Sequence, residues 1–297
     1  ALTALSMAAF DPAFLGATPA RQVINMHLAF NLVLAILALP AIVPVLSLVS
    51  SFVRPPSTPA ALARVSALDP AALANPDRAL ACAAREILQM GEGIEAMLRS
   101  VIGLYDRWDD QVAAAITAKE DDIDKMHFET KLYLARLNRA HSEEEVTHKG
   151  LELANMAVNL ESAGDAIARS MLGLARRLNE SGTAFSETGR KEVRDFHDRV
   201  LSNAQAALNV LMTLNPDAAR ALVEEKEHVR VLEQDLQRSH LDRLRQGRVE
   251  SIDTSNIHQE TLRALKQVNT AFSMVAYPIL SETGDLLASR LAKPHRG

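Results

Sequence analysis

The chain has 297 residues, of which 48% are hydrophobic but only 4% aromatic, and its net charge at pH 7 is −5. A chain of this length holds one large core or two small ones, and its richness in Ala, Leu, Glu and Arg is typical of a helix bundle. The negative charge argues against a nucleic-acid partner, and the single cysteine, Cys82, excludes an internal disulfide framework and a Cys-based zinc site.

Near the start of the chain, residues 23–53 form an uncharged stretch of 31 positions without Asp, Glu, Lys or Arg. About 20 apolar residues cross a bilayer core, so the stretch predicts a transmembrane helix at the end of a membrane domain, residues 1–53. A buried helix of a soluble protein is the alternative. Arg54 and Arg64 follow the stretch, whereas Arg21 is the only basic residue before it. Because basic residues favour the cytoplasmic side, the rest of the chain is expected in the cytoplasm.

The next segment, residues 54–76, is rich in proline and is expected to form an extended linker, because proline prevents a continuous helix. Residues 77–297 then change to the 3.6-residue periodicity of amphipathic helices. Six helices are predicted, at about 77–107, 110–138, 143–178, 188–214, 216–247 and 253–287. The third carries the clearest apolar stripe: Leu153, Met156, Leu160, Ala163, Ile167, Met171, Leu174 and Leu178.

A weak internal repeat relates the two halves of this helical region. A shift of 107 residues aligns Asp110 with Asp217, Lys119-Glu120 with Lys226-Glu227, Leu134 with Leu241, and Arg136-Leu137 with Arg243-Leu244. The register predicts two three-helix units in tandem, at about 77–180 and 186–290. Chance alignment of two amphipathic helices is the alternative.

Five segments, taken in chain order, carry a resemblance to a known family. They are Ala20-Arg21 with Asn25-Met26-His27-Leu28-Ala29-Phe30-Asn31, then Leu68-Asp69-Pro70-Ala71, Ala84-Arg85-Glu86-Ile87-Leu88-Gln89-Met90-Gly91-Glu92, Asn159-Leu160-Glu161-Ser162-Ala163-Gly164-Asp165 and Ala276-Tyr277-Pro278-Ile279-Leu280. As a set they resemble the C-terminal part of bacterial sodium/phosphate cotransporters, and the fourth is similar to the NLERIGD signature of PhoU domains. In the first segment, the residues that match the family motif are Arg21, His27, Phe30 and Asn31.

The resemblance implies an all-α fold, with a transmembrane helix followed by a PhoU-like pair of three-helix bundles. It also implies the bacterial inner membrane as the location and a cytoplasmic domain that regulates or senses phosphate transport without catalysis. The family's Gln-Ser-Ser segments, which bind sodium and phosphate, do not occur here. The substrate site is therefore expected upstream of Ala1, and this chain alone should not transport. The implied partners are the membrane, sodium and phosphate through that upstream part, and a second copy or a regulatory protein.

Two acidic pairs are candidate metal ligands: Glu120 with Asp124, and Glu161 with Asp165. Residues four apart on a helix lie on one face, so facing helices would bring four carboxylates together. Such oxygen ligands suit Mg²⁺, Mn²⁺ or iron. PhoU domains carry acidic pairs of this kind in both repeats, whereas here the second repeat keeps only one acid. The remaining acid is Glu227, with Val231 and Ala264 where further acids would be expected. A solvated acidic face is the alternative.

Two further interpretations remain open. Glu145-x-x-His148 and Glu225-x-x-His228 have the spacing of di-iron carboxylate bundles, which would make the chain a di-metal enzyme. That site also needs glutamates from two more helices, and Glu145 lies near a helix start, where acids usually serve the helix dipole. No Gly-rich phosphate loop or nucleophile triad occurs, so no catalytic residues are expected. The third interpretation is a membrane-tethered interaction bundle without a ligand.

Overall fold

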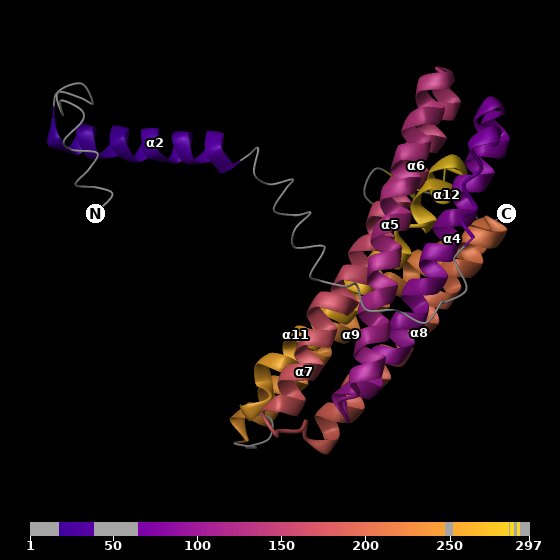
Figure 1. Ribbon diagram of the computed structural model, residues 1–297. Coiled ribbons are helices and arrows are strands. Elements are labelled where there is room, and N and C mark those ends of the chain that lie inside the picture. The colour runs from indigo at the N-terminus through magenta and orange to yellow at the C-terminus, as the bar shows by residue number, and fades with distance from the viewer. Residues whose placement is uncertain (1–17, 39–64, 247–251, 285, 288–289, 292–297) are drawn as a thin grey trace. The chain divides into compact units, whose positions relative to one another are not determined.

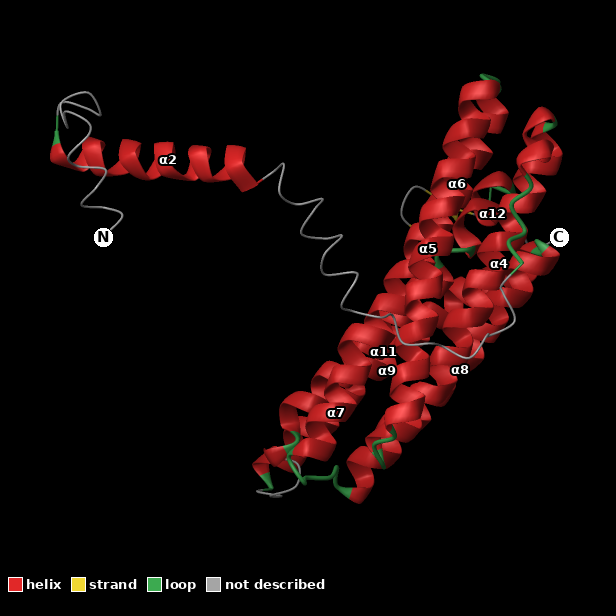
Figure 2. Ribbon diagram, in the orientation of Figure 1, coloured by secondary structure: helices red, strands yellow, loops and turns green. Residues whose placement is uncertain are grey.

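The computed structural model describes residues 18–38, 65–246, 252–284, 286–287 and 290–291. The chain divides into two compact units, Ala1–Arg64 and Val65–Gly297. Figure 2 shows that nearly all the described residues are helical. One short antiparallel pair, β1 (Leu286–Leu287) with β2 (Arg290–Leu291), is added near the C-terminus. The predicted all-α class is confirmed.

The first unit contains helix α2, Pro19–Ala38, whose apolar side chains are largely exposed. The motif residues Arg21, His27, Phe30 and Asn31 all lie on this helix, where the Asn31 side-chain amide donates to the His27 carbonyl at 2.9 Å. Among the described residues, no helix combines the length and the apolar character that a membrane crossing requires. The predicted transmembrane helix is therefore not found there. Its second half, residues 39–53, lies outside the described residues.

The second unit begins with a segment that packs against the helices instead of extending away from them. The fully buried Glu86 carboxylate accepts hydrogen bonds from the Ser66 hydroxyl at 3.1 Å and the Ala67 amide at 2.6 Å. The Tyr133 hydroxyl donates to the Asp69 carbonyl at 2.9 Å. A buried carboxylate needs such donors, and this need explains why residues 65–69 of the expected linker are fixed on the bundle. The remaining part, residues 54–64, lies outside the described residues.

Two groups of helices build the bundle (Figure 1). The first comprises α4 (Pro76–Val101), the 3₁₀ turn η4 (Ile102–Tyr105), α5 (Asp110–Ala140), α6 (Glu144–Asp165), the π turn η5 (Ala166–Met171) and α7 (Leu172–Glu180). A second 3₁₀ turn, η3 (Pro70–Ala74), precedes α4. The second group comprises α8 (Glu187–Thr213), α9 (Pro216–Arg245), α11 (Ser255–Ser273) and α12 (Ala276–Glu282).

Local sequence fixes several helix starts. Asn75, Asp109, Ser186 and Asn215 each precede a helix, and each side chain accepts a hydrogen bond from a backbone amide of the first turn. These caps satisfy donors that the helix leaves unpaired. Helix α8 ends at Thr213, and the residue that caps it, Leu214, adopts a left-handed conformation with φ of 50°.

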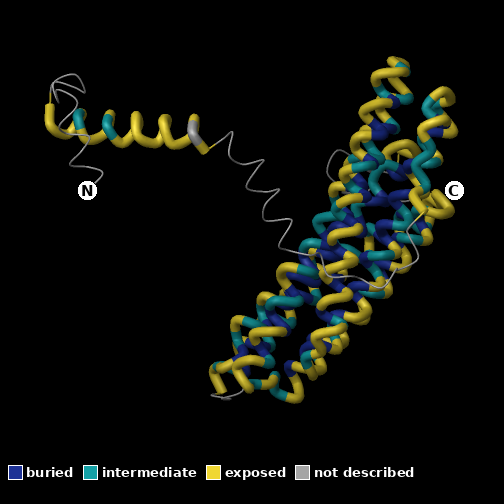
Figure 3. Tube along the Cα trace, in the orientation of Figure 1, coloured by how far each residue is buried: buried dark blue, intermediate teal, exposed yellow. Residues whose placement is uncertain are grey.

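One apolar core joins the two groups, because α4 packs against α8 and α6 against α11. Figure 3 shows the buried positions along the inward faces of the helices. Seven of the eight residues in the predicted stripe of the third helix are buried, and Leu153 is half-buried against the core. Truncating a buried leucine of this kind, such as Leu160, typically costs about 2–5 kcal/mol.

Two of the predicted helices are interrupted. The third is not a continuous α-helix, because the π turn η5 divides α6 from α7. The sixth is divided between Ser273 and Ala276, where Met274 and Val275 form hydrogen bonds three residues back. Pro278 explains this second break, since it has no amide proton to offer the carbonyl of the preceding turn.

Candidate metal centre

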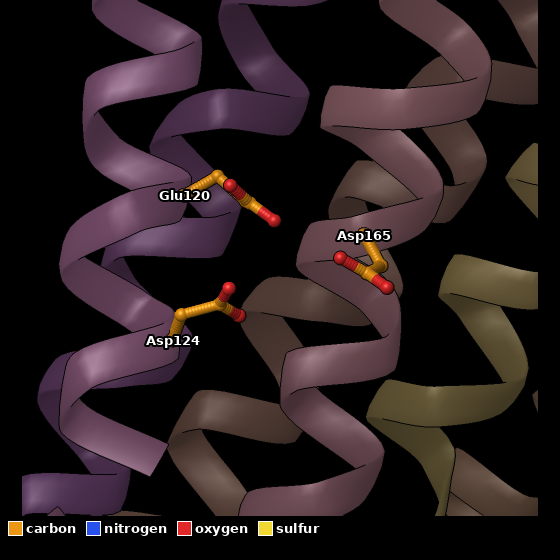
Figure 4. Close-up of side chains that lie close together, drawn as sticks. All are labelled: Glu120, Asp124 and Asp165. Atoms are coloured by element: carbon orange, nitrogen blue, oxygen red, sulfur yellow. The ribbon is translucent and has the colours of Figure 1, made fainter. Parts of the chain in front are cut away.

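Three of the four predicted acids form one compact group. Glu120 and Asp124 lie one turn apart on α5, and Asp165 ends α6, which packs against α5 (Figure 4). One oxygen from each carboxylate lies within 4.8 Å of the others. Glu161, the fourth predicted acid, lies one turn before Asp165 and is not in this group. In the part of the chain that the structure describes, the group of Glu120, Asp124 and Asp165 is the one cluster of three or more possible ligand side chains whose ligand atoms lie this close together.

A basic residue that the sequence analysis did not single out faces the acidic group. Arg169 lies within the π turn, with its Nε 3.0 Å from Asp165 Oδ1 and its Nη2 3.2 Å from Glu120 Oε1. The same Nη2 is 3.9 Å from Asp124 Oδ2. The chain thus supplies its own cation to all three carboxylates. The spacing of four between Asp165 and Arg169 is the sequence signal that indicates this pairing.

The carboxylates are nonetheless crowded. Burial, the Asp165 carboxyl and the Asp124 charge raise the pKa of Glu120, and Arg169 offsets only part of that rise. Burial and the charges of Asp165 and Asp124 likewise raise the pKa of Glu161. Asp165 Oδ1 is buried and, despite its proximity to Arg169, has no hydrogen bond of good geometry. A further cation at this site would therefore be stabilised.

These residues fit a hard divalent cation. They offer carboxylate oxygens from two packed helices, the ligand type that Mg²⁺, Mn²⁺ and iron prefer. Glu120 is only 8% exposed, so its charge is poorly solvated, whereas the Asp124 side chain is 43% exposed and leaves the group open to solvent. Arg169, whose side chain is 66% exposed, is the group that an incoming cation would have to displace.

The second repeat has no equivalent cluster among the described residues. Glu227 is exposed and binds Arg230, whose Nε donates to its carboxylate at 2.9 Å. Val231 is 43% exposed and Ala264 is buried. The second repeat lacks acids at Val231 and Ala264 in the sequence, and its described residues accordingly form no acidic group in the structure.

The two Glu-x-x-His motifs do not assemble into a di-iron site among the described residues. Glu145 is exposed and accepts a hydrogen bond from Lys149 at 2.7 Å, while His148 lies 3.7 Å from Glu152. Glu225 pairs with Arg199 at 2.5 Å and with its own motif partner His228 at 3.1 Å. The charged side chains of both motifs are thus engaged in ion pairs with nearby residues.

A buried polar cluster in the second repeat was also missed in the sequence. Arg243 of α9 donates two hydrogen bonds to Glu192 of α8, at 2.6 and 2.7 Å. His258 of α11 lies 3.4 Å from the same carboxylate, and its ring stacks on His240 with centroids 4.8 Å apart. Burial alone would raise the pKa of Glu192, but the nearby His258 ring and the hydrogen bonds from Arg243 and Ser239 lower it to about 2. Burial and the charges of His258 and Arg243 lower the pKa of His240 to about 4.

Comparison with known proteins agrees with this architecture. Residues 87–170, which include all three residues of the acidic group, match the PhoU domain family. The crystal structure of PhoU from Pseudomonas aeruginosa aligns with a TM-score of 0.63 and 18% identity, covering 69% of this chain and 97% of that chain. The phosphate transport system regulatory protein PhoU from Streptococcus pneumoniae aligns with a TM-score of 0.63 and 16% identity, covering 72% of this chain and 100% of that chain. The chain therefore carries a PhoU domain, and its helical bundle has the PhoU fold.

More similar sequences extend the relationship beyond the domain. The Salmonella typhimurium protein named "Putative inorganic phosphate export protein YjbB" is 34% identical over 265 residues, which is 88% of this chain and 48% of that protein. The Escherichia coli K12 protein of the same name is 32% identical over 263 residues, 89% of this chain and 48% of that protein. The chain is thus homologous to the YjbB proteins and spans about half of their length. The PhoU resemblance predicted from the sequence is confirmed.

Proposed function

We propose that this chain is the C-terminal part of a phosphate transporter of the bacterial inner membrane, and that its PhoU-like bundle regulates or senses transport from the cytoplasm. The observation that carries the proposal is the similarity to the two YjbB proteins over nearly nine tenths of this chain. Their name assigns them to inorganic phosphate export. The bundle acts as a non-enzymatic module in this proposal, and its contacts with a membrane part or a regulatory protein carry the signal.

The transport chemistry in this proposal belongs to the half of the longer relatives that this chain does not span. Sodium coupling is the finer part of the proposal, and it rests on the resemblance of residues 20–31 to the sodium/phosphate cotransporters. Arg21, His27, Phe30 and Asn31, which carry that resemblance, lie together on α2.

A chimera tests the proposal. The C-terminal half of Escherichia coli YjbB is replaced by this chain, and movement of radioactive phosphate is measured in membrane vesicles with sodium or potassium as the cation. We expect sodium-dependent phosphate movement whose rate changes when residues 65–297 are removed. Equal rates with and without those residues would contradict a regulatory role. Equal rates in sodium and potassium would contradict sodium coupling.

We also propose that Glu120, Asp124 and Asp165 bind a divalent cation, Mg²⁺, Mn²⁺ or iron, with Glu161 as a nearby charge. A bound cation would neutralise the crowded carboxylates and stabilise the fold by mass action. The double substitution Asp124→Asn with Asp165→Asn should abolish the rise in melting temperature on adding Mn²⁺. The matched control is Glu227→Gln in the second repeat, which should leave the rise intact. An equal Mn²⁺-dependent shift in all three proteins would indicate only a solvated acidic face.

A further inference from the structure

A surface pocket of about 520 Å³ lies between the η5–α7 segment and α11. Two small residues are part of its lining, Gly173 on α7 and Ala264 on α11. A Cβ added at Gly173 would meet no atom within 4 Å, so the space beside this glycine is open. The pocket therefore lies where the third helices of the two repeats meet, next to the acidic group but distinct from it.

Three arginines line this pocket: Arg169, Arg177 and Arg263. The one acidic residue in the lining is Glu260, which pairs with Arg177 at 2.9 Å. Arg263 is exposed and has no hydrogen bond or ion pair with any described residue. The lining thus holds three arginines and one acid, and Arg263 is the arginine of the three whose charge no described carboxylate pairs with. We call this site the arginine pocket.

We propose that the arginine pocket binds a phosphate group, either as free inorganic phosphate or as the end of a polyphosphate. Guanidinium groups present their donors in a planar fork that matches phosphate oxygens, and several forks on one side of a cavity favour a multiply charged anion. Ser170 and Gln267, which also line the pocket, add a hydroxyl and an amide as neutral donors. The proposal deepens the proposed function, because it gives the phosphate-sensing module a direct site for phosphate.

Arg169 connects this pocket to the acidic group. The same side chain lines the pocket and pairs with Glu120 and Asp165. A divalent cation on those carboxylates would release Arg169, which could then turn toward phosphate. Cation and phosphate should therefore strengthen each other's binding, and by linkage the effect must be reciprocal.

Titration calorimetry of the full chain with inorganic phosphate, at fixed ionic strength, tests the site. We expect saturable binding that Arg263→Gln and Arg177→Gln each weaken by about tenfold or more, the effect of losing a charged hydrogen bond. Arg176→Gln is the matched control, since Arg176 lies on the same helix but pairs with Glu180 at 2.8 Å and does not line the pocket. Arg263→Lys, which keeps the charge without the fork, should give an intermediate affinity.

Two further arms complete the experiment. Tighter binding of pyrophosphate than of phosphate identifies a polyphosphate end as the ligand, and the reverse order identifies free phosphate. Added Mg²⁺ should tighten phosphate binding in the wild type but not in Arg169→Gln. Absence of saturable binding, or equal weakening by Arg176→Gln and Arg263→Gln, would overturn the phosphate site. Such a failure leaves the transporter proposal to be judged by the chimera, so the two failures are distinguishable.

Discussion

The two repeats use charge in opposite ways. In the first, Glu120, Asp124 and Asp165 gather beside solvent, and an exposed Arg169 side chain covers them. In the second, Glu192 and Arg243 form a two-hydrogen-bond pair in the interior, where their side chains are only 13% and 8% exposed. The first group of helices therefore holds an open group of charges and the second holds a closed group.

The difference between the two groups of charges suggests different roles, with the open group suited to binding a ligand and the closed group to stabilising the fold. In the open group the pKa of Glu120 is raised by burial and by the neighbouring carboxylates, so its charge is imperfectly satisfied and a cation would relieve it. In the closed group the Glu192 carboxylate accepts hydrogen bonds from Arg243 and Ser239, and its pKa is lowered to about 2. We therefore expect substitutions in the closed group to affect folding, and substitutions in the open group to affect binding.

The largest expected effect comes from breaking the closed group. Glu192→Ala leaves Arg243 buried without its partner, and removal of one member of a buried pair typically costs about 3–5 kcal/mol. Urea denaturation of the metal-free protein measures the loss. Glu187→Ala, at an exposed position on the same helix, should change stability by less than about 1 kcal/mol. A loss at Glu192 no larger than this control would mean that the pair contributes little to folding.

Measuring the free energy of unfolding against pH sharpens the comparison, and the expected change is smaller than the loss from Glu192→Ala. Since the folded state lowers the pKa of His240 from 6.5 to about 4, the unfolded state takes up a proton first as the pH falls. Stability should decrease by roughly 1–3 kcal/mol between pH 6.5 and 4. It should decrease again between pH 4.5 and 2 as Glu192 protonates. Urea midpoints of His240→Gln should vary less over the first window, whereas the exposed His148→Gln should follow the wild type. Identical slopes in all three proteins would assign the pH dependence to other groups.

The smallest effect is expected in the open group. Burial and the neighbouring carboxylates raise the pKa of Glu120, so the stability that it contributes is present below pH 4.5 and lost as the pH rises through its folded value. At pH 7 without metal, Glu120→Gln should therefore leave stability unchanged or increase it by less than about 1 kcal/mol. Denaturation in the presence of a chelator checks this, with the exposed Asp122→Asn on the same helix as the control. A decrease above about 2 kcal/mol would contradict this expectation and show that the Glu120 carboxylate stabilises the fold.

The sequence predicted the helices well because their apolar stripes and caps are local signals. The Asn215-Pro216-Asp217 start of α9 and the stripe through Leu160 needed no tertiary information. The acidic group was predicted in part, since spacing places Asp124 beside Glu120 but cannot say that Glu161 lies outside the group. The Glu192 pair joins residues 51 positions apart, so no helical periodicity connects them. The arginine pocket is lined by residues of different helices, which is likewise a tertiary property.

The π turn η5 also marks the place where this chain can change in length. Its hydrogen bonds run five residues back in place of four, so the turn holds one residue more than the α-helix on either side. Deleting one residue between Asp165 and Leu172 would therefore convert the turn to α-helix and leave α7 in register with α6. Leu174 and Leu178 would then stay in the core. The same deletion within α7 itself would instead rotate the residues that follow it by about 100°.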